Sequence, residues 1–147
     1  MNGYLRIGFC FVILITLCNC GSQSPENAYK SIVDEANKGN YEKVYESFTA
    51  KSQGQLDMSL KMVVGMVAAF ADEGDADAER LKNLSGKELF VAMCSDEDKG
   101  ESPVALGEMI STKTNGDFAT LRVREDGEEK EVQMVKENGQ WKLHFEV

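Results

Sequence analysis

The chain has 147 residues, 42% of them hydrophobic, and carries 25 acidic against 16 basic side chains, for a formal net charge of −9 at pH 7. A chain of this length and composition forms one domain with a single core and needs neither a metal nor a disulfide to hold it. Its acidic surface gives no attraction toward phosphate backbones, which argues against nucleic acid as a partner.

The N-terminal segment has the layout of a secretory signal peptide. Arg6 precedes an apolar run from Ile7 to Leu17, about half of the roughly 20 residues that a membrane-spanning helix needs. Small and polar residues follow this run, as they do at the end of a cleaved signal. Because Arg6 and the amino terminus are its only positive charges, an uncleaved anchor is kept as an alternative. Three of the four cysteines lie in this segment, which argues against a disulfide scaffold.

Residues 17–20, Leu-Cys-Asn-Cys, resemble the lipobox of bacterial lipoproteins. In that class an aliphatic residue stands three positions before a cysteine whose thiol receives a diacylglyceryl group, and the signal is cut just before this cysteine. The resemblance implies that Leu17 is the aliphatic position and Cys20 the lipidated residue. Asn19 departs from the usual Gly, Ala or Ser. Cys18 is the rival acceptor, although it would place the bulky Leu17 beside the cut.

These features predict residues 1–19 as the signal peptide, residues 20–25 as the lipidated cysteine with its tether, and residues 26–147 as a single α+β domain. Each buried acyl methylene contributes roughly 0.8 kcal/mol, so several acyl chains on one cysteine hold a protein on a bilayer. We therefore expect an exported protein that is anchored in a membrane by its lipid. Gly21 after the cysteine implies, by analogy, the outer membrane or the periplasmic face.

The first half of the domain has helical periodicity. Ser24, followed by Pro25, predicts the capped start of a helix that Gly39 ends, and a second short helix follows. Residues 55–73 predict a longer helix, which its wide apolar stripe makes the most buried one. A methionine-rich face also occurs on adaptable binding surfaces, but core filling is the commoner explanation. The stripe comprises Leu56, Leu60, Val63, Val64, Val67 and Phe70, broadened by Met58, Met62 and Met66.

Acidic side chains crowd residues 72–79 and 96–101. Neither stretch has the glycine at position six and the glutamate at position twelve that a calcium-binding EF-hand loop requires, so both are predicted as solvated loops. Between them, Ser85 and Glu88 have the spacing of a capping box, which predicts a short helix. Cys94, near the end of this helix, is predicted to be a small buried hydrophobic residue.

The last third of the chain predicts four antiparallel strands. The turn dipeptides Asn115-Gly116, Asp126-Gly127 and Asn138-Gly139 favour tight hairpins, and the segments between them alternate apolar with polar residues. With residues 103–113 ahead of them, they predict a meander with one apolar face, which the helices must cover. The expected fold class is α+β, with N-terminal helices packed on a curved four-stranded antiparallel meander.

Residues 116–127, GDFATLRVREDG, and residues 135–145, VKENGQWKLHF, look similar to the nuclear-transport-factor-two-like superfamily, also called SnoaL-like or cystatin-like. The nearest branch is one of small bacterial lipoproteins, in which a segment similar to residues 24–48 opens the domain and a Gly-x-Trp-Lys strand closes it. This resemblance implies a cone-shaped cavity between sheet and helices. In members of the superfamily such a cavity can hold a small apolar ligand or the active site of an isomerase, cyclase or dehydratase.

Motifs for catalysis, cofactor binding or metal binding are not found in the sequence. It has no glycine-rich phosphate loop and no G-x-S-x-G elbow, and one histidine with one free cysteine in the mature chain cannot build a zinc site. His144 alternates with Trp141 and Leu143, so it is predicted on the wet face of the sheet. The tyrosines at helical spacing are predicted to be core residues: Tyr29, Tyr41 and Tyr45.

The sequence thus favours a lipid-anchored, non-catalytic module of the cell envelope that binds a small apolar ligand or an envelope protein, without cofactor or metal. One alternative is a small isomerase or cyclase that uses Asp, Glu or Tyr groups in the cavity. Another is a structural assembly or immunity-type factor whose acidic face meets a basic partner.

Overall fold

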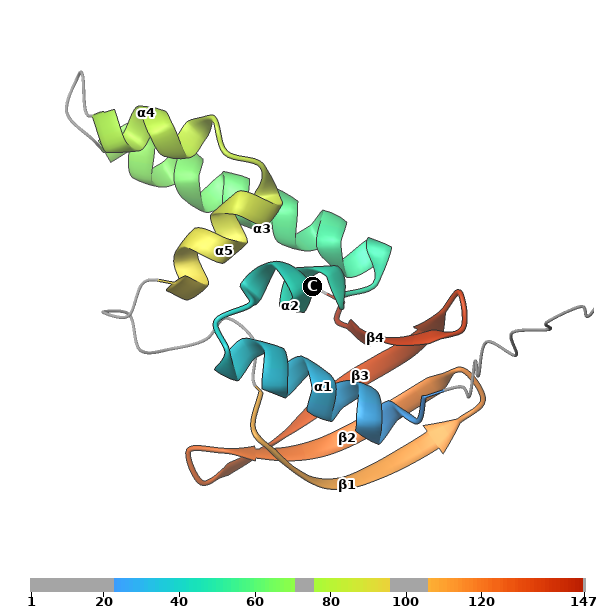
Figure 1. Ribbon diagram of the computed structural model, residues 1–147. Helices are drawn as coiled ribbons and strands as arrows, with labels where there is room; N and C mark the ends of the chain where they lie inside the picture. The colour runs from blue at the N-terminus through green and yellow to red at the C-terminus, as the bar shows by residue number, and fades with distance from the viewer. Residues whose placement is uncertain (1–22, 71–75, 96–105, 147) are drawn as a thin grey trace, which may run out of the picture.

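The computed structural model describes residues 23–70, 76–95 and 106–146. Within these residues, helices precede a single antiparallel sheet in which the strands follow their order in the sequence (Figure 1). The α+β class and the meander are therefore confirmed. The elements are α1 (Pro25–Asn37), α2 (Tyr41–Glu46), α3 (Ala50–Phe70), α4 (Ala76–Lys82), α5 (Gly86–Ser95), β1 (Glu108–Asn115), β2 (Phe118–Glu125), β3 (Glu128–Glu137) and β4 (Gln140–His144).

Local signals set the helix ends as predicted. The Ser24 side chain accepts a hydrogen bond from the Asn27 backbone N–H at the start of α1, and Gly39, with φ of +74°, lies in the turn to α2. At α5, the Ser85 N–H donates to the Glu88 carboxylate while the Glu88 N–H donates to the Ser85 hydroxyl. This reciprocal pair is a capping box, which satisfies two N–H groups that the helix leaves unpaired.

Two of the three hairpins use the predicted turn dipeptide, whereas the first turns at Gly116-Asp117 rather than at Asn115-Gly116, because Asn115 still pairs with Phe118 in the sheet. In the β2–β3 and β3–β4 turns, Asp126-Gly127 and Asn138-Gly139 all have positive φ, as type I′ turns require. In the β1–β2 turn only Gly116 has positive φ, and it stands at the first position of a two-residue loop with Asp117. A glycine at that position is typical of a type II′ turn, which matches strand twist equally well.

The helices cover the apolar face of the sheet. α1 lies across the sheet, while α3, α4 and α5 project away from it beyond α2 (Figure 1). Arg122 and Arg124 are exposed on the opposite face of β2, where both pair with Glu129. The fully buried side chains of the core are Tyr29, Val44, Phe48, Leu89, Phe90, Leu121, Val123, Met134 and Leu143.

Two helices differ from their predictions. α3 begins five residues before residue 55 and is not the most buried helix, since only Ser52 and Leu60 along it are buried. α4 forms in a stretch that was predicted as a loop, because Ala78 is buried and Leu81 packs against the core. None of the helices in residues 23–70 and 76–95 has the length and hydropathy that a bilayer crossing requires.

Candidate functional site

The predicted lipidation site lies outside the described residues, as do its rival Cys18 and the predicted signal peptide of residues 1–19. The predicted acidic loop of residues 96–101 and the first residues of the predicted first strand also lie outside them. The described chain begins at Gln23, and α1 starts two residues later. The lipidation of Cys20 therefore stays a prediction.

Aromatic rings fill the space between α2, α5 and the sheet. Phe48 lies at the centre of this group, with its ring centroid 5.9 Å from that of Phe90 and 5.6 Å from that of Phe145. Tyr45 adds a fourth ring, 5.7 Å from Phe90. The two contacts of Phe48 have the edge-to-face geometry that aromatic pairs favour. The part of the sheet–helix space beneath α2 and α5 is therefore packed with side chains, whereas a pocket of about 370 Å³ lies between α1 and β1.

Two tyrosine hydroxyls are engaged in structural hydrogen bonds. Tyr29 donates to the Gly107 carbonyl at 3.0 Å, and Tyr45 donates to the Asp57 carboxylate at 2.6 Å. Burial raises the pKa of Tyr29 to about 12. Burial, together with the hydrogen bond to Asp57, raises the pKa of Tyr45 as well. Both side chains are core residues, as predicted, and both hydroxyls stay protonated at neutral pH, where they hold distant segments together.

His144 does not point into solvent, contrary to the prediction. Its side chain is only 15% exposed, and its Nδ1 lies 3.0 Å from Thr49 Oγ1 and 3.5 Å from Ser52 Oγ. Its Nε2 lies 3.6 Å from a carboxylate oxygen of Glu146. The cause is the path of the chain before α3: Ser47 and Thr49 form backbone hydrogen bonds with Leu143 on the outer edge of β4, which brings the start of α3 beside the histidine.

A hydroxyl, an imidazole and a carboxylate that lie side by side, as Thr49, His144 and Glu146 do here, are the components of nucleophilic catalysis. Here, however, the hydroxyls are buried, with Thr49 1% and Ser52 0% exposed. Thr49 Oγ1 caps α3 by accepting from the Ser52 N–H, and Ser52 Oγ bonds both the N–H and the carbonyl of Phe145. A substrate cannot reach these oxygens, so the cluster fastens α3 to the end of β4.

The thiol of Cys94 is also poorly suited to act as a nucleophile. Its side chain is half-buried rather than fully buried, and it packs against the core. Burial raises the pKa of the thiol to about 11, so the reactive thiolate is scarce at neutral pH. Within the described residues, no three His, Cys, Asp or Glu side chains gather as metal ligands would.

A surface groove of about 450 Å³ lies between α1, α2 and β4. Its charged side chains pair with one another: Glu35 lies 3.0 Å from the Lys43 ammonium and 3.2 Å from that of Lys38, and it accepts a hydrogen bond of 2.8 Å from Asn40. These donors hold the pKa of Glu35 at about 2. The Lys142 ammonium donates to the Glu46 carbonyl. These charged side chains of the groove are therefore engaged with groups of the same chain.

The lowered pKa of Glu35 predicts a pH dependence of stability. The stabilisation by its ionised form is complete above about pH 4.5, the unfolded value, and is lost as the pH falls toward 2. Glu35→Gln is therefore expected to lower the melting temperature at pH 6, and the difference from the wild type should shrink steadily below pH 4.5. The matched control is Glu42→Gln, whose ion pair with Lys87 is 3.8 Å long. If Glu35→Gln lowers the melting temperature by the same amount at pH 6 and at pH 2.5, ionised Glu35 does not stabilise the fold as described.

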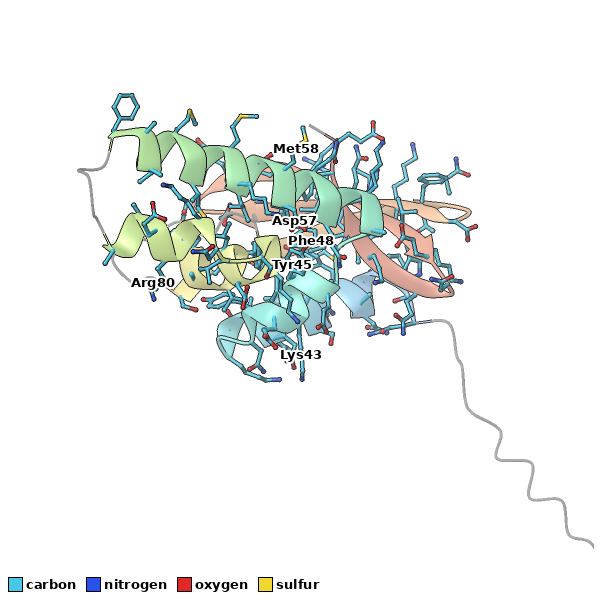
Figure 2. All side chains as sticks on the ribbon, turned by 90° about the horizontal axis from the view of Figure 1, so that it is seen from above. Lys43, Tyr45, Phe48, Asp57, Met58 and Arg80 are labelled. Carbon is cyan, nitrogen blue, oxygen red and sulfur yellow. The ribbon has the colours of Figure 1, made fainter. Side chains whose placement is uncertain are left out.

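The exposed side of α3 is the most unusual surface of the described chain. Figure 2 shows Met58 on the outer side of this helix, whereas the neighbouring Asp57 points inward toward Tyr45. We call the exposed large apolar residues of this helix the α3 face. It comprises Phe70, 91% exposed, Met58, 68%, Met62, 60%, Met66 and Val67, each 54%, and Val63, 43%.

The packing of α3 explains this exposure. The side of the helix that carries Leu60 and Val64 packs against the core, where α4 and α5 pack on it and Tyr45 of α2 bonds to it through Asp57. The largest apolar patch on a typical monomer is about 300–600 Å² and often functional. The α3 face exposes between 43% and 91% of each of six large apolar side chains, so its apolar area is on the order of several hundred Å². The α3 face is therefore the candidate functional site.

Comparisons with known proteins give no relative from which a site could be transferred. No protein-family model, no curated protein and no solved structure matches the chain. The candidate site consequently rests on the chemistry and exposure of its own side chains.

Proposed function

We propose that this protein is a lipid-anchored, non-catalytic module of the bacterial cell envelope that binds a protein partner. The observation that carries the binding function is the α3 face, since an apolar surface of this size favours a covering partner. Anchoring is supported by the lipobox-like residues 17–20 and by the short distance in sequence from Cys20 to the start of α1. A nuclear-transport-factor-two-like cone is the fold we propose, supported by the helices that precede a meander.

Binding is preferred over catalysis because the candidate chemical groups are engaged elsewhere. An isomerase or cyclase of this architecture needs an ionisable group that a substrate can reach. The hydroxyls of Tyr29 and Tyr45 form hydrogen bonds inside the fold, and His144 contacts the buried hydroxyls at the start of α3. Beneath α2 and α5 aromatic rings occupy the space that a small ligand would need, so a ligand would have to bind at the pocket of about 370 Å³ between α1 and β1.

The lipid anchor predicts a residue-specific loss of modification. When the full chain is expressed in a bacterium supplied with an alkyne-tagged fatty acid, the wild type is expected to carry the label and to enter the detergent phase on extraction. Cys20→Ala should lose at least nine-tenths of the label, because the thiol that accepts the lipid is gone. Cys18→Ala, the matched control, should keep it. If the label persists in Cys20→Ala but disappears in Cys18→Ala, the lipidated residue is Cys18 rather than Cys20. If none of the three chains carries the label, the lipid anchor is refuted.

A further inference from the structure

We infer that the partner of the α3 face is a second copy of this chain, whose own α3 face packs against it about a two-fold axis. This inference rests on the proposed protein-binding function and names the partner. In such an isologous contact the same patch serves both sides, so a surface must be complementary to itself. The α3 face meets this condition through its charge, its shape and its size.

The charge of the α3 face permits contact with an identical surface. Nine consecutive residues, from Met62 to Phe70, carry no ionisable side chain. Two copies therefore bring no like charges together when these segments meet, and neither copy buries an unpaired charge, which would be costly. A partner with a charged surface would gain nothing from this segment, whereas an apolar surface gains from every covered side chain.

The shape of the face fits a helix-to-helix contact. Gly65 and Ala69 are exposed and lie four residues apart on α3, beside the methionines at 62 and 66. A Cβ at Gly65 would meet nothing within 4 Å, so this part of the helix surface is open. Small residues let a second helix approach closely, and flexible methionine side chains adapt to fill the space beside them.

The size of the face agrees with that of a dimer interface. Standard protein interfaces bury about 800 Å² on each partner, and homodimer interfaces are more apolar than others. The α3 face, with an apolar area on the order of several hundred Å², is of this order and is composed of Met, Val and Phe side chains. A second α3 helix offers the same side chains along the same length, and it would cover first Met58, Met62 and Met66, which follow one another at four-residue spacing along one stripe.

A lipid surface is a less suitable partner for the α3 face. Helices that lie on membranes carry rows of Lys and Arg along their polar side, but α3 has only Lys51 and Lys61, with Asp57 between them. The whole chain has a net charge of −9, which anionic lipids repel. The start of α1, where the proposed anchor attaches, and the end of α3 lie at opposite ends of the molecule (Figure 1). The anchor therefore does not bring this face to the bilayer.

The test is site-specific photo-cross-linking of the full chain in the bacterial envelope. The photoreactive residue p-benzoylphenylalanine replaces Met62 in one variant, and Lys113 in the control. Lys113 is exposed on β1, an edge strand of the sheet, and so lies on a different element from the α3 face. Irradiation of the Met62 variant is expected to give an adduct of twice the chain mass that contains only this chain. The Lys113 variant should give at least ten-fold less of it.

A second substitution tests whether the adduct forms through the α3 face. Met66→Glu, added to the Met62 probe, should reduce the doubled-mass adduct at least ten-fold, since each copy would then bring an unpaired carboxylate into the apolar contact. Met66 is 54% exposed, so a single copy should fold with an unchanged circular dichroism spectrum. An adduct with a different protein would show that the partner is not a second copy of this chain, but it would agree with the proposed protein-binding function. Adducts with lipid alone, with residues 7–17 of the same chain, or with nothing would overturn both.

Discussion

Phe48→Ala is expected to lower the free energy of unfolding by about 3–5 kcal/mol, the range for removing a phenylalanine side chain from a packed core. Phe48 is 2% exposed and its ring contacts those of Phe90 and Phe145. The alanine leaves a cavity that these neighbours cannot fill, because they belong to α5 and to the residues just after β4. The loss affects the helical layer and the sheet together.

The position of Phe48 adds to this effect. It pairs with Leu143 in an isolated parallel bridge, and the hydrogen bonds of Ser47 and Thr49 to Leu143 surround it. The side chain therefore holds the segment that closes the edge of β4 and starts α3. A drop in melting temperature of about 10–20 °C is expected from the lost stability.

The measurement is urea unfolding followed by the fluorescence of Trp141, the single tryptophan of the chain, which is 9% exposed and so reports on the core. All variants are compared at one protein concentration, because association raises apparent stability. Phe118→Ala is the matched control: Phe118 is 64% exposed on the sheet, and its loss should change stability by less than about 0.5 kcal/mol. Similar effects of the two substitutions would contradict the described core.

Gly107→Ala is the second substitution with a large expected effect, about 3 kcal/mol or more, because it forces side-chain atoms into occupied space. A Cβ at this position would lie 2.3 Å from the carbonyl oxygen of Arg124 and 2.5 Å from its carbonyl carbon. These are backbone atoms of β2, which pairs with β1 on one side and β3 on the other. They cannot move without disturbing both pairings. The shift would also strain the hydrogen bond from Tyr29 to the Gly107 carbonyl.

Gly54→Ala is the control, and it should raise the free energy of unfolding rather than lower it. Gly54 lies within α3, and a Cβ there would meet nothing within 4 Å. Alanine is favoured over glycine in a helix interior by about 0.5–1 kcal/mol, so this variant should be more stable than the wild type. The same unfolding experiment measures both. If Gly107→Ala unfolds at the wild-type urea concentration, the close approach to β2 is wrong.

The elements with local causes follow from the sequence alone. The cap of α1 at Ser24, the capping box at Ser85 and the positive φ angles of Asp126 and Asn138 each depend on a few neighbouring residues. Alternation along the strands likewise needs only a two-residue period to separate the buried from the wet face. These features, and with them the α+β class, could be predicted from the chain alone.

Which apolar surfaces are covered depends on long-range packing. Helical periodicity places the methionines of α3 on one stripe, but it does not say whether another element packs on that stripe, and here Met58 stays 68% exposed. His144 has the alternation of a solvent-facing residue, yet the distant pairing of Thr49 with Leu143 brings a buried hydroxyl against it. Burial is a property of contacts between residues far apart in sequence, so the chain predicts where apolar side chains lie, and the fold decides which of them remain free to bind.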